Sequence, residues 1–235
     1  MDIREKLRIF LEKSVMKYEN QSTYGINTFN LERNLPLRNV SSNLWIASDA
    51  ELVLTDVEFI KKAGEKIASD LEGIEFDCIL TVEAKAIPIC YKICECLDIK
   101  TFALARKSVK SYMKNYLEET IKSITTSSIQ KLVLDGENIA KIKDKNIVVF
   151  DDVISTGGTI NGLINLAKRL KSSIVKVVTI WLEGPSLFIK FAEDLMNCKL
   201  IFYDILPLFA KGEIYNYLLE EKKKAEEIIE KWGKI

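Results

Sequence analysis

Residues 147–160 have the sequence IVVFDDVISTGGTI, the most informative segment of the chain for predicting its fold. Its first four residues are apolar and predict a buried strand. Two adjacent carboxylates follow, Asp151 and Asp152, and a short turn then leads into a helix expected over residues 159–170. A buried strand that passes through a turn into a helix is typical of an open parallel sheet. In such sheets, ligands bind beyond the carboxyl ends of the strands.

The turn after the two carboxylates has the composition of a phosphate-binding site. The N-terminus of a helix offers free backbone N–H groups and the positive end of the helix dipole. Gly157 and Gly158 let the backbone approach a phosphate closely. Three hydroxyl groups add donors, from Ser155, Thr156 and Thr159. The carboxylates stand where the vicinal hydroxyls of a sugar would lie, so this one segment suits a ribose 5-phosphate. Neither the P-loop motif nor the dinucleotide fingerprint occurs in it.

Composition excludes several classes of protein. The chain has 235 residues, of which 48% are hydrophobic and 29% charged, as in a folded globular protein. Lys+Arg and Asp+Glu each total 34, so an overall basic surface for nucleic acid is absent. No apolar run reaches the length of a membrane span, and the charged start differs from a secretory signal. We therefore expect a cytoplasmic protein that binds neither nucleic acid nor membrane.

The cysteines and the absence of histidine further limit the kinds of catalysis and metal binding that are possible. Five cysteines, an odd number, indicate free thiols in a reducing compartment rather than a disulfide framework. Cys90 and Cys94 fall on one face of a predicted helix and are expected to be small buried hydrophobic residues, while Cys96 points elsewhere. The chain contains no histidine, which excludes a histidine general base or metal ligand.

Hydrophobic periodicity predicts alternating helices and strands along the chain. Helices are expected over residues 3–18, 56–71 (with Thr55 as N-cap), 88–97, 159–170 and 213–232. Strands are expected over residues 77–82, 101–105, 129–134, 146–151, 175–182 and 199–203. Residues 20–50 show no regular pattern and are expected to be irregular. The alternation implies an α/β fold with a doubly wound, mainly parallel sheet. The long polar insertion at residues 107–128 is expected to be a functional lid or hairpin, or else disordered.

The stretch 147–160 resembles the signature of the type I phosphoribosyltransferases, which bind phosphoribosyl pyrophosphate (PRPP). That signature has four apolar residues, two acids, two apolar residues, a small residue and Thr-Gly-Gly-Thr, and every position matches here. The resemblance implies the fold of that family. It also implies that the 5-phosphoribosyl group of PRPP is bound by Asp151, Asp152, Val153, Ser155, Thr156, Gly157, Gly158 and Thr159.

Two further loops resemble pyrophosphate-binding segments of the purine-type members of this family. Residues 81–84, Thr-Val-Glu-Ala, resemble a loop of the adenine and xanthine enzymes that often contains a non-proline cis peptide bond. Arg106-Lys107 resembles a basic pair of the same enzymes. The resemblance implies that pyrophosphate is bound by Glu83, Ala84, Lys85, Arg106 and Lys107. Taken alone, Glu83 and Lys85 would be a surface ion pair, and Arg106-Lys107 a solvated basic end.

The family resemblance also implies a mechanism. A purine nitrogen displaces pyrophosphate from C1 of PRPP through an oxocarbenium-like transition state, and the protein supplies no nucleophile. Positioning, charge stabilisation and Mg²⁺ drive such a reaction. Asp151, Asp152 and Lys107 are the candidate catalytic residues, and the two aspartates would contact Mg²⁺ indirectly or through PRPP. Residues 108–130 would form a flexible lid over the reacting sugar.

In this family, a variable hood built from the chain ends reads the base. We therefore divide the chain into residues 1–50 (N-terminal helix and part of the hood), 51–184 (catalytic core) and 185–235 (C-terminal hood and terminal helix). Base-reading candidates lie within residues 20–50 and 183–212. Asp204 and Leu206 are the candidate base-binding residues, although Leu206 equally suits a hood core. Overall resemblance favours adenine, yielding AMP and pyrophosphate in purine salvage, with hypoxanthine, guanine and xanthine as alternatives. A homodimer is expected.

A transcriptional regulator is the rival from a different class, because such proteins carry the same domain and use PRPP as an effector. They place a winged-helix module before it. Here about 50 residues precede the helix expected at residue 56, without a clear helix-turn-helix pattern, and the net charge is zero. The sequence therefore favours an enzyme. An orotate enzyme is disfavoured by the Thr-Val-Glu-Ala loop.

Overall fold

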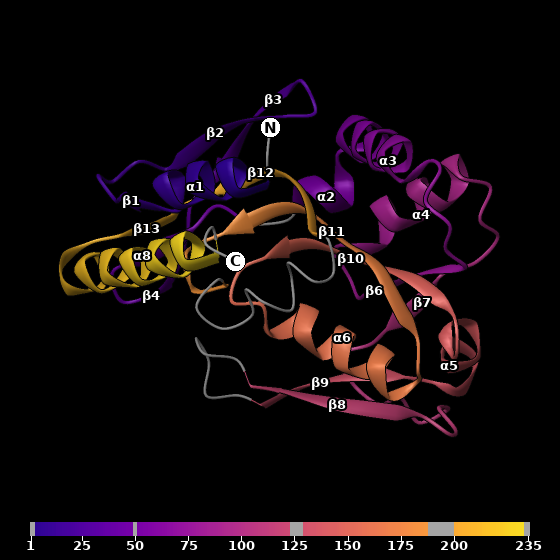
Figure 1. Ribbon diagram of the computed structural model, residues 1–235. Helices are drawn as coiled ribbons and strands as arrows, with labels where there is room; N and C mark the ends of the chain where they lie inside the picture. Colours follow the sequence, from indigo (N-terminus) through magenta and orange to yellow (C-terminus); the bar gives the residue numbers. More distant parts are fainter. Residues whose placement is uncertain (1–2, 49–50, 123–128, 188–199, 233–235) are drawn as a thin grey trace.

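The computed structural model describes residues 3–48, 51–122, 129–187 and 200–232 (Figure 1). Its centre is a five-stranded sheet in the order β12-β11-β10-β6-β7, in which every neighbouring pair is parallel. The strands are β6 (Cys78–Val82), β7 (Ala103–Ala105), β10 (Asn146–Ile154), β11 (Ser173–Glu183) and β12 (Leu200–Leu206). The predicted α/β fold with a parallel sheet is thereby confirmed.

Strand β10 lies in the middle of the sheet and is buried on both faces. Ile147 and Val149 belong to the hydrophobic cluster on one face, and Val148 and Phe150 to the cluster on the other. All four side chains are fully buried. This alternation follows from the two-residue period of a strand. It explains why a central parallel strand has a continuous apolar sequence.

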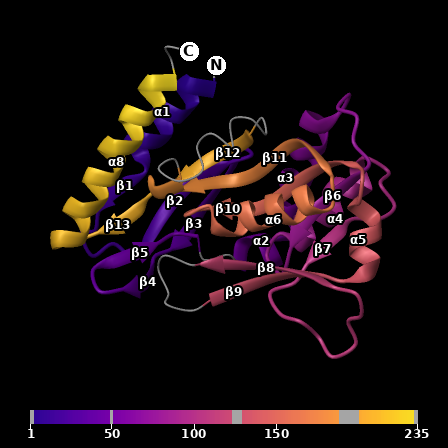
Figure 2. The same ribbon diagram turned by 60° about the horizontal axis from the view of Figure 1, so that its bottom comes forward.

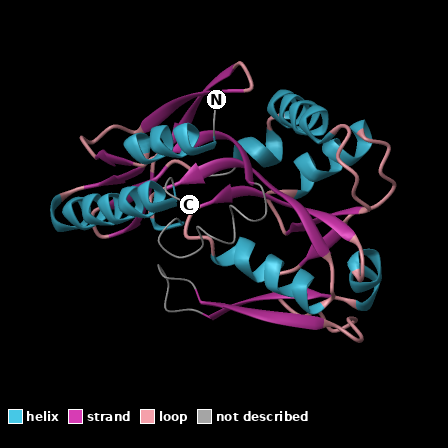
Figure 3. Ribbon diagram, in the orientation of Figure 1, coloured by secondary structure: helices cyan, strands magenta, loops and turns pink. Residues whose placement is uncertain are grey.

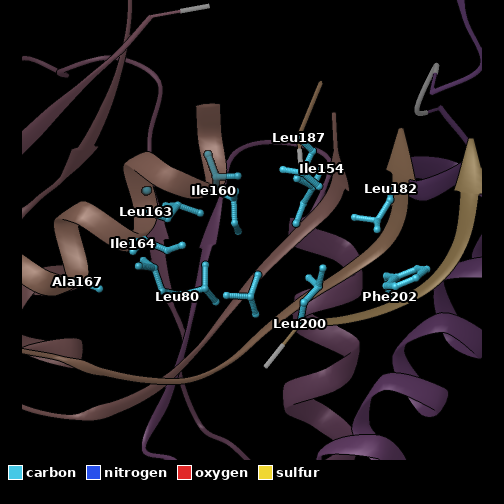
Figure 4. Close-up of a cluster of buried hydrophobic side chains, with 14 of the residues drawn as sticks. Leu80, Ile154, Ile160, Leu163, Ile164, Ala167, Leu182, Leu187, Leu200 and Phe202 are labelled. Carbon is cyan, nitrogen blue, oxygen red and sulfur yellow. The ribbon is translucent and has the colours of Figure 1, made fainter. Parts of the chain in front are cut away.

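Helices cover both faces of the sheet (Figure 3). The helices α2 (Glu51–Thr55), α3 (Val57–Leu71) and α4 (Ile87–Cys96) contribute to one cluster, and α6 (Gly158–Arg169) packs on the opposite face. Figure 4 shows side chains of α6, including Ile160, beside Leu80 and Ile154 of the sheet.

The two terminal helices extend the α6 side of the core. Helices α1 (Ile3–Lys13) and α8 (Gly212–Trp232) lie side by side (Figure 2) and bury residues such as Phe10 and Ala225 against β12. The predicted helix over residues 3–18 is too long, because β1 (Val15–Lys17) follows at once. Ser14 closes α1 with its hydroxyl on the carbonyl of Leu11 at 2.8 Å, and Val15 then pairs with Leu208.

The expectation that residues 20–50 are irregular is wrong. Strands β2 (Thr23–Thr28) and β3 (Leu31–Pro36) form an antiparallel hairpin. Strands β4 (Arg38–Ser41) and β5 (Leu44–Ile46) join β1 and β13 (Leu208–Ala210) in a second sheet, in the order β1-β13-β5-β4. These strands are short and largely exposed, so their hydrophobic alternation is weak. The second sheet is completed by β13, which lies near the other end of the chain and pairs with both β1 and β5.

The polar insertion contains a hairpin formed by β8 (Leu117–Lys122) and β9 (Ile129–Leu134), and residues 123–128 between them lie outside the described residues. The hairpin is attached to α6: Asn165 Nδ2 donates to Glu119 Oε1 at 3.1 Å, and Arg169 Nη1 donates to the Glu118 carbonyl at 2.7 Å. The strands are thus held in place by α6. The predicted lid at residues 108–130 therefore includes a packed hairpin.

Two local expectations about helices need correction. Asp56, not Thr55, caps α3, since its carboxylate accepts a hydrogen bond from the Phe59 N–H at 2.9 Å. The Thr55 hydroxyl instead donates to the Glu51 carbonyl inside α2. A further helix, α5 (Gly136–Ile142), was not expected from the sequence; Asp135 caps it.

The cysteines behave as expected where the structure describes them. Cys90 and Cys94 are buried within α4, Cys96 is exposed, and all three are free. Cys198 lies outside the described residues. No helix in the described part of the chain is both long and apolar enough to cross a membrane.

Candidate functional site

Three loops meet at one edge of the central sheet. Strands β10, β6 and β7 are neighbours and run parallel, so their carboxyl ends lie together. Residues 155–157 follow β10, residues 83–86 follow β6, and Arg106-Lys107 follows β7. All the segments predicted to bind the phosphoribosyl group and pyrophosphate therefore lie at this edge. This is the place where open parallel sheets bind ligands.

The turn after β10 surrounds a small cavity at the N-terminus of α6. Gly157 is the N-cap residue of α6, with a left-handed φ of +78° that a residue with a side chain would adopt only with strain. Its carbonyl accepts from the Asn161 N–H at 2.9 Å, which begins the helix. The cavity measures about 180 Å³ and is lined by Asp151, Val153, Ile154, Ser155, Thr156, Gly157, Gly158, Thr159 and Ile160. The free N–H groups of the helix begin at this cavity, so it suits a phosphate.

The two aspartates at the end of β10 are buried, with exposed fractions of 6% for Asp151 and 5% for Asp152. The Asp152 N–H donates to Asp151 Oδ1 at 3.0 Å. Burial raises the pKa of Asp151 well above its usual value, and repulsion from Asp152 raises it further. Burial also raises the pKa of Asp152, against the opposing effects of Asp151, Lys85 and Lys107. Two buried acids so close together favour a bound cation or hydroxyl donors between them.

Glu83 connects the loops after β6 and β7. Its carboxylate accepts from Arg106 Nη1 at 3.0 Å and from the Lys107 N–H at 2.6 Å, and its own N–H donates to the Ala105 carbonyl. The peptide bond between Glu83 and Ala84 is cis. The sequence taken alone allowed a surface ion pair between Glu83 and Lys85. In the structure Glu83 pairs with Arg106 instead. Glu83 holds two basic residues at the edge of the site.

Lys85 and Lys107 bring positive charge to the buried aspartates. Lys107 lowers the pKa of both Asp151 and Asp152, and Lys85 lowers that of Asp152. Lys85 Nζ also donates to the Ser48 carbonyl at 3.4 Å. Carboxylates that suit sugar hydroxyls or a metal ion thus lie beside cations that suit phosphates, as a sugar phosphate requires.

The candidate base-binding residues have partners of their own in this structure. Asp204 Oδ2 accepts from the Thr28 hydroxyl at 2.5 Å, and Asp204 Oδ1 accepts from the Ile205 N–H at 2.8 Å. Trp181 Nε1 donates to the same Thr28 hydroxyl at 3.3 Å. Leu206 is fully buried. Asp204 therefore ties the β2–β3 hairpin to β12, and base binding by Asp204 and Leu206 stays a prediction.

The sequence did not predict where Glu183 lies. It indicated only that Glu183 belongs to the candidate base-reading segment, residues 183–212. Glu183 ends β11 and is buried, with 4% of its surface exposed. Burial raises the pKa of Glu183 to about 7, although Ser48, Ser155 and Lys85 act to lower it. A glutamate at a strand end normally predicts a solvent-exposed residue, so the sequence carries no signal of this burial.

The comparison with protein families agrees with this geometry. Residues 54–192, more than half of the chain, match the phosphoribosyl transferase domain, and the chain belongs to this family. The predicted family is thereby confirmed.

Relatives of known function include both regulators and enzymes. The chain is 27% identical over 126 residues to the purine biosynthesis transcriptional activator PurR of Lactococcus lactis, covering 54% of this chain and 45% of PurR. It is 28% identical over 144 residues to an adenine phosphoribosyltransferase of Lachnoclostridium phytofermentans, covering 59% of this chain and 77% of that enzyme. It is 31% identical over 130 residues to a hypoxanthine/guanine phosphoribosyltransferase of Methanopyrus kandleri, covering 54% of this chain and 64% of that enzyme. The chain thus spans about half the length of the PurR regulators it matches.

Solved structures share the fold at low identity. An adenine phosphoribosyltransferase of Thermoanaerobacter pseudethanolicus matches with a TM-score of 0.57 and 18% identity, covering 86% of this chain and 99% of that one. The enzyme from Trypanosoma brucei, solved with AMP, pyrophosphate and ribose-5-phosphate, matches with a TM-score of 0.57 and 15% identity, covering 85% and 79%. These matches establish the type I phosphoribosyltransferase fold.

Proposed function

We propose that this protein is a purine phosphoribosyltransferase that transfers the 5-phosphoribosyl group of PRPP to a purine base, with adenine as its substrate. One observation carries the proposal. The Asp151-Asp152 pair, the turn of residues 155–157 (called the phosphate turn below) and three basic side chains from two other loops meet at one edge of the sheet. This arrangement supplies a separate group for each part of PRPP. The turn faces the 5-phosphate, the carboxylates face the ribose hydroxyls, and the basic side chains face the pyrophosphate.

The proposed reaction needs positioning and charge stabilisation rather than a protein nucleophile. A ring nitrogen of the base forms a bond to C1 of the ribose while the C1–O bond to pyrophosphate breaks, and the base releases its N–H proton. Negative charge grows on the departing pyrophosphate, where Lys85, Arg106 and Lys107 would stabilise it. Asp151 and Asp152 would stabilise the positive charge on the sugar and hold its hydroxyls. Glu83 would act by fixing Arg106 and Lys107.

Magnesium fits this site through the two aspartates. Carboxylate oxygens suit Mg²⁺, which commonly takes one or two carboxylates and completes its shell with water and substrate phosphates. Within the described residues no group of three or more acidic or thiol side chains is arranged to hold a metal ion, so substrate oxygens would be needed as well. We propose that Asp151 and Asp152 hold Mg²⁺ together with PRPP. The ion would neutralise the charge on the leaving pyrophosphate.

Adenine is proposed as the base because of how fully the chain covers its relatives. It spans 77% of the L. phytofermentans adenine enzyme, but 64% of the hypoxanthine/guanine enzyme of M. kandleri and 66% of a xanthine enzyme of Clostridium tetani. We further propose that the second sheet and the β2–β3 hairpin form the hood of residues 1–50 and 185–235. We expect a cytoplasmic homodimer, and sedimentation equilibrium would test the dimer.

A PRPP-sensing regulator is the second candidate, favoured by the 27% identity to PurR of L. lactis. Residues 3–48 argue against DNA binding by this part of the chain. They contain one helix, α1, followed by five strands that pair among themselves and with β13. A winged-helix module requires several consecutive helices, and this described segment has a different structure.

Release of pyrophosphate separates the two candidates. The purified protein is incubated with PRPP, Mg²⁺ and one of adenine, hypoxanthine, guanine or xanthine, and both pyrophosphate and the nucleoside monophosphate are quantified. We expect AMP and pyrophosphate in equal amounts with adenine. PRPP binding without turnover on any of the four bases would contradict the enzyme and support the regulator.

A further inference from the structure

Glu183 is a buried acid next to the phosphate turn. Within the sheet, Leu182 pairs with Ile154, so Glu183 lies opposite Ser155, the first residue of the turn. On its other side, Glu183 pairs with Leu206, which is apolar and fully buried. The side chain of Glu183 is itself 96% buried, being 4% exposed. A carboxyl group therefore lies inside the protein, next to Ser155 of the turn that we propose to bind the 5-phosphate.

Three segments surround the carboxyl group of Glu183. Ser155 approaches it from the phosphate turn, Ser48 from the segment before α2, and Lys85 from the loop after β6. Lys85 is the charged side chain that acts on it among the described residues, and Lys85 also donates to the Ser48 carbonyl at 3.4 Å. Lys85 stabilises the ionised form of Asp152 as well. This single cation is therefore shared between Glu183 and Asp152.

The hydrogen bonds around Glu183 are incomplete. Its Oε1 atom is buried and has no hydrogen-bond partner. A buried carboxylate oxygen without a partner is costly, whereas a proton on the carboxyl group removes most of that cost. The ionised and protonated states of this carboxyl group are therefore close in free energy. Its charge is easily changed by any new charge placed at the adjoining turn.

We propose that Glu183 is a proton-linked positioning residue, which takes up a proton when an anionic phosphate occupies the turn and thereby frees Lys85 to face that ligand. The inference rests on the proposed function, because PRPP is the ligand concerned. The physical reason is electrostatic: a phosphate beside Ser155 disfavours a second negative charge next to it. Once Glu183 is neutral, the charge of Lys85 is no longer divided between Glu183 and Asp152.

The titration of Glu183 fits this role. Burial raises the pKa of Glu183 to about 7, with Ser48, Ser155 and Lys85 opposing the rise, so both states are populated near neutral pH. A bound anion raises the pKa of a neighbouring acid further. Ligand binding near pH 7 and above is then accompanied by proton uptake. By linkage, the affinity for the ligand falls as pH rises through this range.

Isothermal titration calorimetry with PRPP in the presence of Mg²⁺ tests the proposal. Titrations at pH 7 in two buffers of different ionisation enthalpy give the number of protons taken up on binding. The wild-type protein is compared with Glu183→Gln, a neutral side chain of the same shape, and Glu95→Gln serves as an exposed control. We expect wild type and Glu95→Gln to take up more protons than Glu183→Gln. Between pH 6 and 8, wild-type affinity should fall by up to roughly tenfold more than that of Glu183→Gln.

Ribose 5-phosphate is the second probe, because it occupies the turn without pyrophosphate. The difference in proton uptake should persist with it. Glu183→Met is a second neutral variant in case the glutamine variant folds poorly. Equal proton uptake by wild type and both neutral variants, or no binding of either probe by the wild type, would overturn the inference. Proton-linked binding of ribose 5-phosphate without turnover of any purine would uphold it and overturn the proposed function instead.

Discussion

The two acids at the end of β10 are placed where their charges reduce the stability of the folded protein. Asp151 and Asp152 are buried side by side, and burial raises the pKa of each. Neighbouring backbone N–H groups and lysines only partly offset the cost of keeping both charges inside the protein. We interpret this as a site whose electrostatics are completed by its ligands.

Replacing both aspartates separates stability from function. In Asp151→Asn plus Asp152→Asn, the buried like charges are gone, so the unliganded protein should become more stable. We expect its Tm to rise by roughly 2–6 °C, since 1 kcal/mol shifts Tm by about 2–4 °C in a chain of this size. Turnover should be lost, because the ribose loses both anionic acceptors. Differential scanning calorimetry and the pyrophosphate assay check the two effects, and wild-type kcat/KM in this variant would refute the assignment of the site.

Glu183 makes stability depend on pH in a defined direction. Its pKa is 4.5 in a model peptide and about 7 in the folded protein. The folded state therefore binds the proton more tightly, so this contribution is fully present below pH 4.5 and lost as pH rises to 7. The difference corresponds to about 3 kcal/mol, because one pKa unit is about 1.4 kcal/mol.

Urea unfolding at several pH values measures this contribution. The unfolding free energy of wild type minus that of Glu183→Gln should decrease from pH 4.5 to pH 7.5. Taking the difference removes the effects of the aspartate pair, which both proteins share. A difference that stays constant across this range would show that Glu183 does not titrate there.

At the scale of elements, the hairpin β8–β9 depends on a close approach to α6. Gly162 lies on the face of α6 that meets the hairpin, and a Cβ atom there would come within 2.9 Å of Leu132 Cδ1 and 3.1 Å of Ile121 Cγ1. Because residue 162 has no side chain, the hairpin can pack closely against α6. Asn165 and Arg169, one and two turns further along α6, add hydrogen bonds to the hairpin.

Gly162→Leu should disturb this packing. The larger side chain would push the hairpin away from α6, at a cost of about 1–3 kcal/mol for overpacking a filled interface. Relative to wild type, amide hydrogen exchange in this variant should become faster in β8 and β9 but change little in β10 and β11. Gly25→Leu, at a position where a Cβ atom meets only Asn34 Oδ1 at 3.5 Å, is the matched control. Uniform exchange changes across all these strands would indicate global destabilisation instead.

At the scale of the whole molecule, ligand specificity is the property to measure. A ligand that binds only the folded state stabilises it by about 2.7 kcal/mol at one hundred times its Kd. We expect AMP to raise Tm more than IMP, GMP or XMP at equal concentration, and PRPP to raise it only when Mg²⁺ is present. Thermal shift assays with each ligand check this expectation. A larger shift with IMP or XMP would replace adenine by the corresponding base.

The core of the fold was predictable because its signals are local. Strand β10, the turn after it and α6 are contiguous, and their apolar periods and glycines identify them without reference to other segments. The second sheet was not predictable in this way. Its strands have three to four residues, and β1 pairs with β13 only after the chain has passed through the whole central sheet.

The amino-acid sequence alone was enough to predict the family and the parallel α/β core, and to nominate candidate residues for phosphate and ribose binding. These inferences depend on one continuous strand–turn–helix segment, whose signals are local. Three contacts became visible only in the folded protein: Glu83 holds Arg106 and Lys107, Asp204 accepts a hydrogen bond from Thr28, and Glu183 is buried next to Ser155. Each of these contacts joins segments that are distant along the chain. Burial and electrostatic coupling between such segments follow from the packing of the sheet edge, which no local pattern records.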